Sequence, residues 1–245
     1  MSVFPRDVVA VHQIEVSSRC SLKCVYCPSP SIVAGKYPNR KALDMPRATF
    51  ERTLEWVRFY RRQGTQSELN LAGIGESVLH PEFAAFVRLA REAIGPEARL
   101  IFATNGIPCD EEMVKAIAPY KPEVWVSLHR PEKAGLAVEM YKKYGILAGA
   151  SVDPSISAND WAGQVSWFNS GERIQWQWLR QGKVFVLADG RISTCCLDAQ
   201  GIGVVGHVDD PIGSVSVKPY ELCKKCYQEI GVQGWDQRMG VATDG

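Results

Sequence analysis

The sequence lacks long hydrophobic runs and a strong charge of either sign. None of its apolar stretches approaches the roughly 18 residues that a membrane-spanning helix needs, and the first residues lack the charged and then apolar layout of a signal peptide. The formal net charge is +1, so a general attraction to nucleic acid or to an anionic membrane is not expected. These absences predict a cytoplasmic protein without a membrane anchor, and they do not favour a nucleic-acid partner.

Internal repeats and low-complexity tracts are also absent. What is present, from about residue 12 to 180, is an alternation of short apolar runs with amphipathic stretches. Six strand–helix units in alternation predict an α/β fold with a parallel sheet, a partial (β/α)6 TIM-type barrel over residues 1–180. In such barrels the chemistry collects at the C-terminal ends of the strands. The expected strands are 13–17, 69–72, 100–103, 124–128, 146–152 and 174–179.

The remaining residues, 181–245, have a different sequence pattern. Residues 183–188 and 191–195 read as a hairpin around Asp189-Gly190, and the chain beyond is rich in glycine and loops. We expect a small second domain here that buries little core and depends on a metal for its shape.

The eight cysteines are clustered rather than scattered. In a reducing compartment, clustered cysteines are more often metal ligands or catalytic thiols than disulfides. The lone Cys109 fits a buried small hydrophobe better than an active-site thiol. The others form two groups: Cys20, Cys24 and Cys27, and then Cys195, Cys196, Cys223 and Cys226.

The first group has the spacing C-x3-C-x2-C in the loop after the first expected strand. A structural zinc site usually has four ligands in two pairs, and a closed [4Fe–4S] cluster has four thiolates. Three cysteines without an obvious fourth partner indicate a cluster with one iron left open to a small molecule. A zinc or redox-inert site with the same spacing is the alternative.

With the aromatic Tyr26 before its third cysteine, this segment resembles the signature of the radical S-adenosylmethionine (SAM) superfamily. The resemblance implies that Cys20, Cys24 and Cys27 hold a catalytic [4Fe–4S] cluster whose open iron chelates SAM. It also implies reductive cleavage of SAM to a 5′-deoxyadenosyl radical that abstracts hydrogen from a substrate. The electron would come from a donor such as flavodoxin or ferredoxin.

Further segments are similar to this family. Gly73-Ile74-Gly75-Glu76 resembles the Gly-Gly-Glu motif that binds the SAM amino group, although Ile74 replaces a glycine and Ser77 a proline. A plain strand-to-loop turn is the alternative, as ordinary loop polarity is for the polar strand ends. The resemblance implies these SAM-binding residues: Tyr26, Gly75, Glu76, Asn105, Ser127, His129 and Ser151.

The second group resembles the C-terminal SPASM extension, or its shorter twitch form, which holds an auxiliary cluster. Cys195 ends a G-x4-C pattern, and Cys223 and Cys226 form C-x2-C. The upstream cysteine of the twitch pattern is missing around residues 175–180, so Cys196 is a further candidate ligand. The resemblance implies an auxiliary [4Fe–4S] cluster on this group. Zinc on the four cysteines is the alternative.

An auxiliary cluster that accepts an electron favours a net oxidation. We therefore expect a radical SAM oxidoreductase that dehydrogenates a small molecule such as a sugar, cyclitol or nucleoside. One alternative is a maturase that oxidises or cross-links a ribosomally made peptide, and another is a non-catalytic cluster-binding scaffold. The basic residues Lys36, Arg40 and Lys41 read as a solvated loop, with contact to an anionic substrate as the other interpretation.

Overall fold

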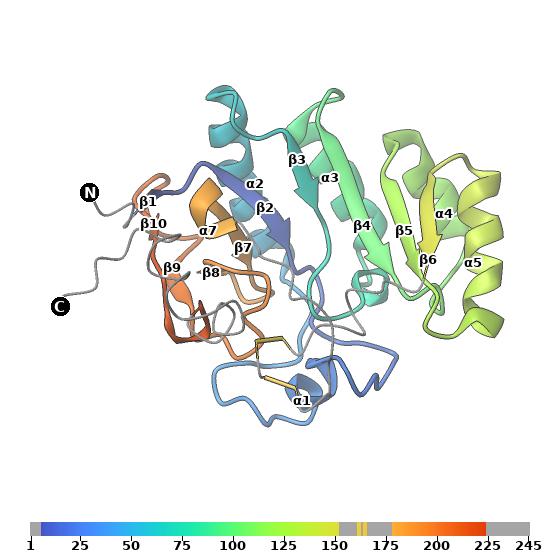
Figure 1. Cartoon of the computed structure of the whole chain (residues 1–245). Coiled ribbons are helices and arrows are strands. Elements are labelled where there is room, and N and C mark those ends of the chain that lie inside the picture. The colour runs from blue at the N-terminus through green and yellow to red at the C-terminus, as the bar shows by residue number, and fades with distance from the viewer. Residues whose placement is uncertain (1–5, 152–160, 163, 166–177, 224–245) are drawn as a thin grey trace.

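A computed structural model of the chain describes residues 6–151, 161–162, 164–165 and 178–223 (Figure 1). Its main sheet has eight strands in the order β6-β5-β4-β3-β2-β7-β8-β9. A separate antiparallel pair joins β1 (Arg6–Asp7) to β10 (Ser216–Val217). The strands of the main sheet are β2 (Ala10–Ile14), β3 (Glu68–Asn70), β4 (Arg99–Thr104), β5 (Glu123–Ser127), β6 (Leu147–Ser151), β7 (Lys183–Val186), β8 (Arg191–Ser193) and β9 (Val204–His207).

Six of these strands are parallel neighbours, which confirms the predicted α/β class with a partial barrel-type sheet. β2 to β6 pair in chain order, and β7 pairs with the free side of β2. The strand expected at 174–179 falls largely outside the described residues. Its last two positions belong to a short helix, α7 (Trp178–Gln181). The sixth parallel strand of the described sheet is therefore β7, at the edge next to β2.

The predicted hairpin is confirmed, because β7 and β8 pair antiparallel. Gly190 takes a positive φ of 87° in its turn, a conformation that costs glycine little. The sheet runs across the expected domain boundary at residue 180, since the hairpin begins with a strand that pairs with β2. The division into domains 1–180 and 181–245 stays a prediction.

Helices follow each of the inner parallel strands, and they cover one face of the sheet (Figure 1). In α2 the buried residues Phe50, Leu54 and Val57 recur at helical spacing, as the sequence predicts. Asp110 caps the N-terminus of α4, and its carboxylate accepts hydrogen bonds from the backbone N–H groups of Glu112 and Met113. The helices are α1 (Ser29–Val33), α2 (Arg47–Arg62), α3 (Phe83–Ile94), α4 (Glu111–Ile117) and α5 (Pro131–Lys143), with single 3-10 turns at Ser77–Leu79 and Ala118–Tyr120.

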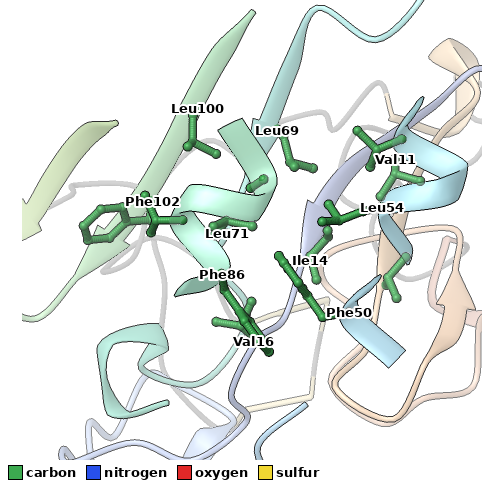
Figure 2. Packing of buried hydrophobic residues seen from close by; sticks show 14 of the residues in the cluster. Val11, Ile14, Val16, Phe50, Leu54, Leu69, Leu71, Phe86, Leu100 and Phe102 are labelled. Carbon is green, nitrogen blue, oxygen red and sulfur yellow. The ribbon is translucent and has the colours of Figure 1, made fainter. Parts of the chain in front are cut away.

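The core lies between the sheet and these helices (Figure 2). Phe50 of α2 stacks on Phe86 of α3 with ring centroids 4.0 Å apart, and both rings are fully buried. Strand residues such as Leu69 and Leu100 point toward the same cluster. The helices pack against the apolar face of the sheet. The opposite face is therefore available for polar side chains and for a functional site.

Charged side chains form ion pairs between neighbouring strands near their N-terminal ends. His12 Nδ1 lies 3.1 Å from Glu68 Oε1, which also pairs with Lys183 Nζ at 3.0 Å. Arg99 donates to both carboxylate oxygens of Glu123, at 2.9 and 2.6 Å. In the part of the chain described here, no helix combines the length and apolar character required to span a bilayer.

Candidate cofactor-binding site

A cavity of about 260 Å³ opens at the C-terminal ends of the parallel strands. Its wall comes from the cysteine loop, from the residues after β3 and β4, and from the segment that follows β8. Ser151 ends β6 beside Ser127 but stays outside the wall. The sequence-predicted residues that the structure brings together in the wall are Cys20, Cys24, Tyr26, Cys27, Gly75, Glu76, Asn105, Ser127, His129 and Cys196.

The first three cysteines are half-buried free thiols, and two of them accept hydrogen bonds. Cys20 Sγ accepts from the backbone N–H of Leu22 at 3.4 Å, and the side-chain amide of Asn105 lies 3.8 Å away. Cys27 Sγ accepts from the N–H of Ser29 at 3.5 Å. Donors of this kind stabilise sulfur that carries negative charge, which is the state in which sulfur binds iron.

Burial opposes that charged state as long as no metal is present. It raises the pKa of the Cys27 thiol to about 12 and raises the pKa of Cys20 as well. Neighbouring cysteines add to both pKa shifts. Metal binding at these thiols therefore has to release protons, and the positive charge of iron has to supply the compensation.

The donor set of three thiols fits an iron–sulfur cluster, because such clusters are held by cysteine thiolates. Sulfurs around one zinc lie about 3.8 Å apart, given a Zn–S bond of about 2.3 Å. Among the described residues, no three His, Cys, Asp or Glu side chains are arranged to hold one metal ion. The three thiols nevertheless line one cavity.

Gly73-Ile74-Gly75-Glu76 follows β3 and passes directly under the cysteine loop. A Cβ on Gly75 would collide with the carbonyl oxygen of Ser17, and one on Gly73 would collide with the side chain of Glu15. Ile74 has room, because its side chain packs in a separate buried cluster with Ile32 and Ala199. This explains why the resembling motif keeps two glycines and tolerates isoleucine between them.

Glu76 is almost fully buried, and it joins three segments. Its backbone N–H donates to Arg19 O at 2.6 Å, and its Oε2 accepts from Asn105 N at 2.7 Å. Burial raises the pKa of its carboxyl to about 7 despite these hydrogen bonds. A carboxylate at a cavity wall with a raised pKa gains from any ligand that brings an ammonium group.

Aromatic rings form another part of the wall. Tyr26 and His129 have ring centroids 5.3 Å apart at a tilt of 55°. Trp161 donates from Nε1 to Tyr26 O at 3.1 Å and also lines the cavity. Sequence reasoning missed Trp161, because it falls outside every motif.

The second cysteine group lies against the same cavity. Cys195 follows β8, and a hydrogen bond with Cys196 together with burial raises its pKa well above that of a free thiol. Burial also raises the pKa of Cys223 to about 12, and Cys195 contributes to that shift. Cys226 lies outside the described residues, so the structure shows three of the four predicted ligands near one another, with Cys196 on the cavity side.

Sequence reasoning placed Arg40 wrongly and passed over Glu15. Arg40 is buried against Glu15, not part of a solvated loop. Glu15 Oε1 also accepts from Ile74 N at 3.1 Å, and its Oε2 accepts from Ala188 N at 3.3 Å. A glutamate between apolar strand residues was the signal that could have revealed this pair.

Three thiols at the mouth of a partial barrel, above a glycine-rich strand end with a buried glutamate, define a cofactor-dependent enzyme of the barrel class. A family model described as the Radical SAM superfamily matches residues 14–153, which include the three thiols, the glycine-rich segment and Glu76. The chain belongs to that superfamily.

Solved structures share the fold. BtrN in complex with AdoMet and 2-DOIA superposes with a TM-score of 0.68 at 18% identity, over 84% of this chain and 81% of that one. anSMEcpe with bound AdoMet superposes with a TM-score of 0.55 at 16% identity, over 89% and 80%. No curated protein matches the sequence.

Proposed function

We propose that this protein cleaves SAM reductively to a 5′-deoxyadenosyl radical, which abstracts hydrogen from a substrate in the cavity. The observation that carries the proposal is that Cys20, Cys24, Cys27 and Glu76 line one cavity at the strand ends. The family implies a [4Fe–4S] cluster and SAM, and the neighbours BtrN and anSMEcpe were solved with AdoMet bound.

In this proposal each part of the wall has a task. The three thiols hold the cluster, and the N–H groups of Leu22 and Ser29 stabilise the charge on sulfur. The Glu76 carboxylate and the carbonyl at Gly75 receive the SAM amino group. When bound, the first cluster supplies the electron that cleaves SAM, and an auxiliary cluster supplies an acceptor for the electron that the substrate gives up.

The position of the second cysteine group supports a net oxidation. Cys196 lines the cavity and hydrogen-bonds with Cys195, so a metal on Cys195, Cys223 and Cys226 would lie close to the substrate. A substrate that loses one hydrogen atom, one electron and one proton is dehydrogenated by two electrons in total. The reaction proposed is therefore an oxidoreductase reaction.

The substrate proposed is a small molecule such as a sugar, cyclitol or nucleoside. BtrN, which superposes over most of both chains, was solved with 2-DOIA. A second candidate is a peptide, since anSMEcpe was also solved with the Cp18Cys peptide, at a TM-score of 0.52. A set of cyclitols and aminosugars tested against short peptides in the same assay separates these two classes.

The function is tested by reconstituting the protein without oxygen and adding SAM and a reductant. We expect 5′-deoxyadenosine from the wild type and from Cys109→Ala, which changes a thiol outside the site. Cys24→Ala should give none. Equal product from the Cys24→Ala protein would contradict the proposal, and absence of product from all three would favour a non-catalytic scaffold.

A further inference from the structure

The segment of residues 19–43, here called the cluster cap, carries the three cysteines and forms the outer end of the molecule. The strand arrows point toward it, and α1 lies beyond their tips (Figure 1). Its inner side packs against the rest of the protein, because Ile32, Tyr37 and Ala42 share a buried cluster with Ile74 and Ala199. Its outer side is therefore the surface nearest to the cysteine ligands.

This cap is strongly one-sided in charge. Between Glu15 and Asp44 the sequence has five basic residues and no acidic one. Two of them are neutralised, because Arg40 pairs with Glu15 and Arg19 pairs with Asp44. The three left exposed, and outside every ion pair found among the described residues, are Lys23, Lys36 and Lys41.

Exposed apolar residues also occur in the cap, between Lys23 and Lys36 in the sequence. Val25 is 65% exposed and Val33 is 54% exposed. Ile202, 44% exposed, adjoins the cap, since Gly201 lies against the carbonyl of Asn39. These are three of the five large hydrophobic residues exposed in the described part of the chain. Exposed apolar residues close in sequence to exposed charges of one sign are typical of a transient protein interface.

We infer that the outer side of the cluster cap is the docking surface for an acidic one-electron carrier protein that reduces the cluster. The inference rests on the proposed function, because only a redox cluster needs such a partner. Cys24 is half-buried between the exposed residues Lys23 and Val25, so a carrier seated here comes within one residue of a cluster ligand. Electron-transfer encounters use small interfaces that charge helps to form.

The charge pattern favours an acidic protein over a nucleic acid. Asp44 holds the fork of Arg19, and exposed lysines without a free arginine fork or exposed aromatic rings give no means of reading or stacking bases. Tyr37 of the cap is half-buried, and its hydroxyl donates to Gln164 O at 3.0 Å. An acidic surface on the partner would be complemented by the three lysines, and its apolar residues would meet Val25 and Val33.

The test compares two matched charge reversals in the reconstituted enzyme. Lys23→Glu/Lys36→Glu alters the cap, and Lys115→Glu/Lys142→Glu makes the same change of charge on exposed helix positions in α4 and α5. Cluster reduction is followed by absorbance and electron paramagnetic resonance, with an acidic reduced flavodoxin or with dithionite and methyl viologen. This readout needs neither SAM cleavage nor the substrate.

We expect the cap variant to be reduced about tenfold more slowly by flavodoxin at low salt, with the deficit shrinking as salt screens the charges. Reduction by dithionite and methyl viologen should stay within about twofold of the wild type, and the α4/α5 variant should match the wild type with both reductants. A wild-type rate of the cap variant with flavodoxin overturns the inference, and so does an equal loss with both reductants. A wild type whose cluster accepts electrons but yields no 5′-deoxyadenosine refutes the proposed function alone.

Discussion

Arg40 Nη2 donates to both carboxylate oxygens of Glu15 at 2.8 Å, in a place where both side chains are shielded from water. Glu15 lies at the end of β2, and Arg40 comes from the cluster cap. The same carboxylate accepts the N–H groups of Ile74 and Ala188, so it joins the cysteine loop to the glycine-rich loop and to the end of β7.

Replacing Glu15 should therefore affect both stability and cofactor binding. Glu15→Gln leaves the Arg40 charge buried without its counter-ion, which costs about 3 to 5 kcal/mol of unfolding free energy. The exposed pair between Arg47 and Glu51 is the control, and Arg47→Met should cost less than about 1 kcal/mol. Urea unfolding of the three proteins measures both values.

A double variant separates stability from positioning. Glu15→Leu/Arg40→Met removes both charges, so it should recover part of the lost stability. It still lacks the acceptor for Ile74 N, and we expect its SAM affinity to remain lower than that of the wild type. Full recovery of SAM binding in this variant would mean that the pair only stabilises the fold.

The glycines of the 73–76 segment give a second prediction. Gly75→Ala forces the new methyl group against the backbone of Ser17 and Arg19, so the cysteine loop has to shift. We expect loss of bound iron after reconstitution and a lower melting temperature. Gly135→Ala is the control, because a Cβ there meets nothing within 4 Å inside α5; it should gain up to about 1 kcal/mol. Retention of full iron content by Gly75→Ala would refute this account of the motif.

The sequence predicted the framework well where its periodic signal was strong. The strand at 100–103 and the helix carrying Phe83, Phe86 and Val87 appear as β4 and α3 within a residue or two at most ends. The strand predicted at 174–179 lies largely outside the described residues, so it stays a prediction. The strand at 183–188 was predicted, but its parallel pairing with β2 was not, because that pairing joins residues more than 160 positions apart.

The site was predictable to the extent that chain-local motifs define it. Cys20, Glu76 and Asn105 come together because parallel strands end at one edge of a sheet, which spacing and strand order reveal. The partnership of Glu15 with Arg40 was not predictable, since a basic residue in a loop looks solvated until its partner is known. Ser151 ends the edge strand β6 and does not line this cavity, so its role in SAM binding stays a prediction.

Cys223 and Cys196 should behave differently when each is replaced. Cys223→Ala removes a proposed ligand of the auxiliary site, so we expect loss of the iron or zinc bound there with the first cluster retained. Cys196→Ala changes the cavity wall, and we expect a weaker effect on metal content than on SAM binding. Iron, zinc and sulfide analysis, with SAM titration by electron paramagnetic resonance, distinguishes these results. Equal metal loss in both variants would make Cys196 a ligand.

His12 predicts a pH dependence of stability at the opposite end of the barrel from the cluster. Burial lowers the pKa of His12 to about 4, although Glu68 acts against the shift and Lys183 adds to it. The unfolded chain therefore takes up this proton at a higher pH than the folded protein, and the stability from a neutral His12 is lost as the pH falls below about 6.5. Relative to His12→Gln, the wild type should lose about 2 kcal/mol of unfolding free energy between pH 7 and pH 5.

Glu76 should show the opposite sign, which makes it an internal check on that measurement. Burial raises the pKa of its carboxyl to about 7, so the folded protein without cofactor holds a proton that the unfolded chain releases. Stability from this group is present at low pH and is lost as the pH rises from about 4.5 to about 7. The wild type should therefore gain stability relative to Glu76→Gln on acidification, as measured by urea unfolding of the metal-free protein.

Bound SAM brings an ammonium group that favours the charged carboxylate, so affinity for SAM should increase toward pH 8 in the wild type and stay level in Glu76→Gln. A level profile in both proteins would show that Glu76 supports the loops without contacting SAM.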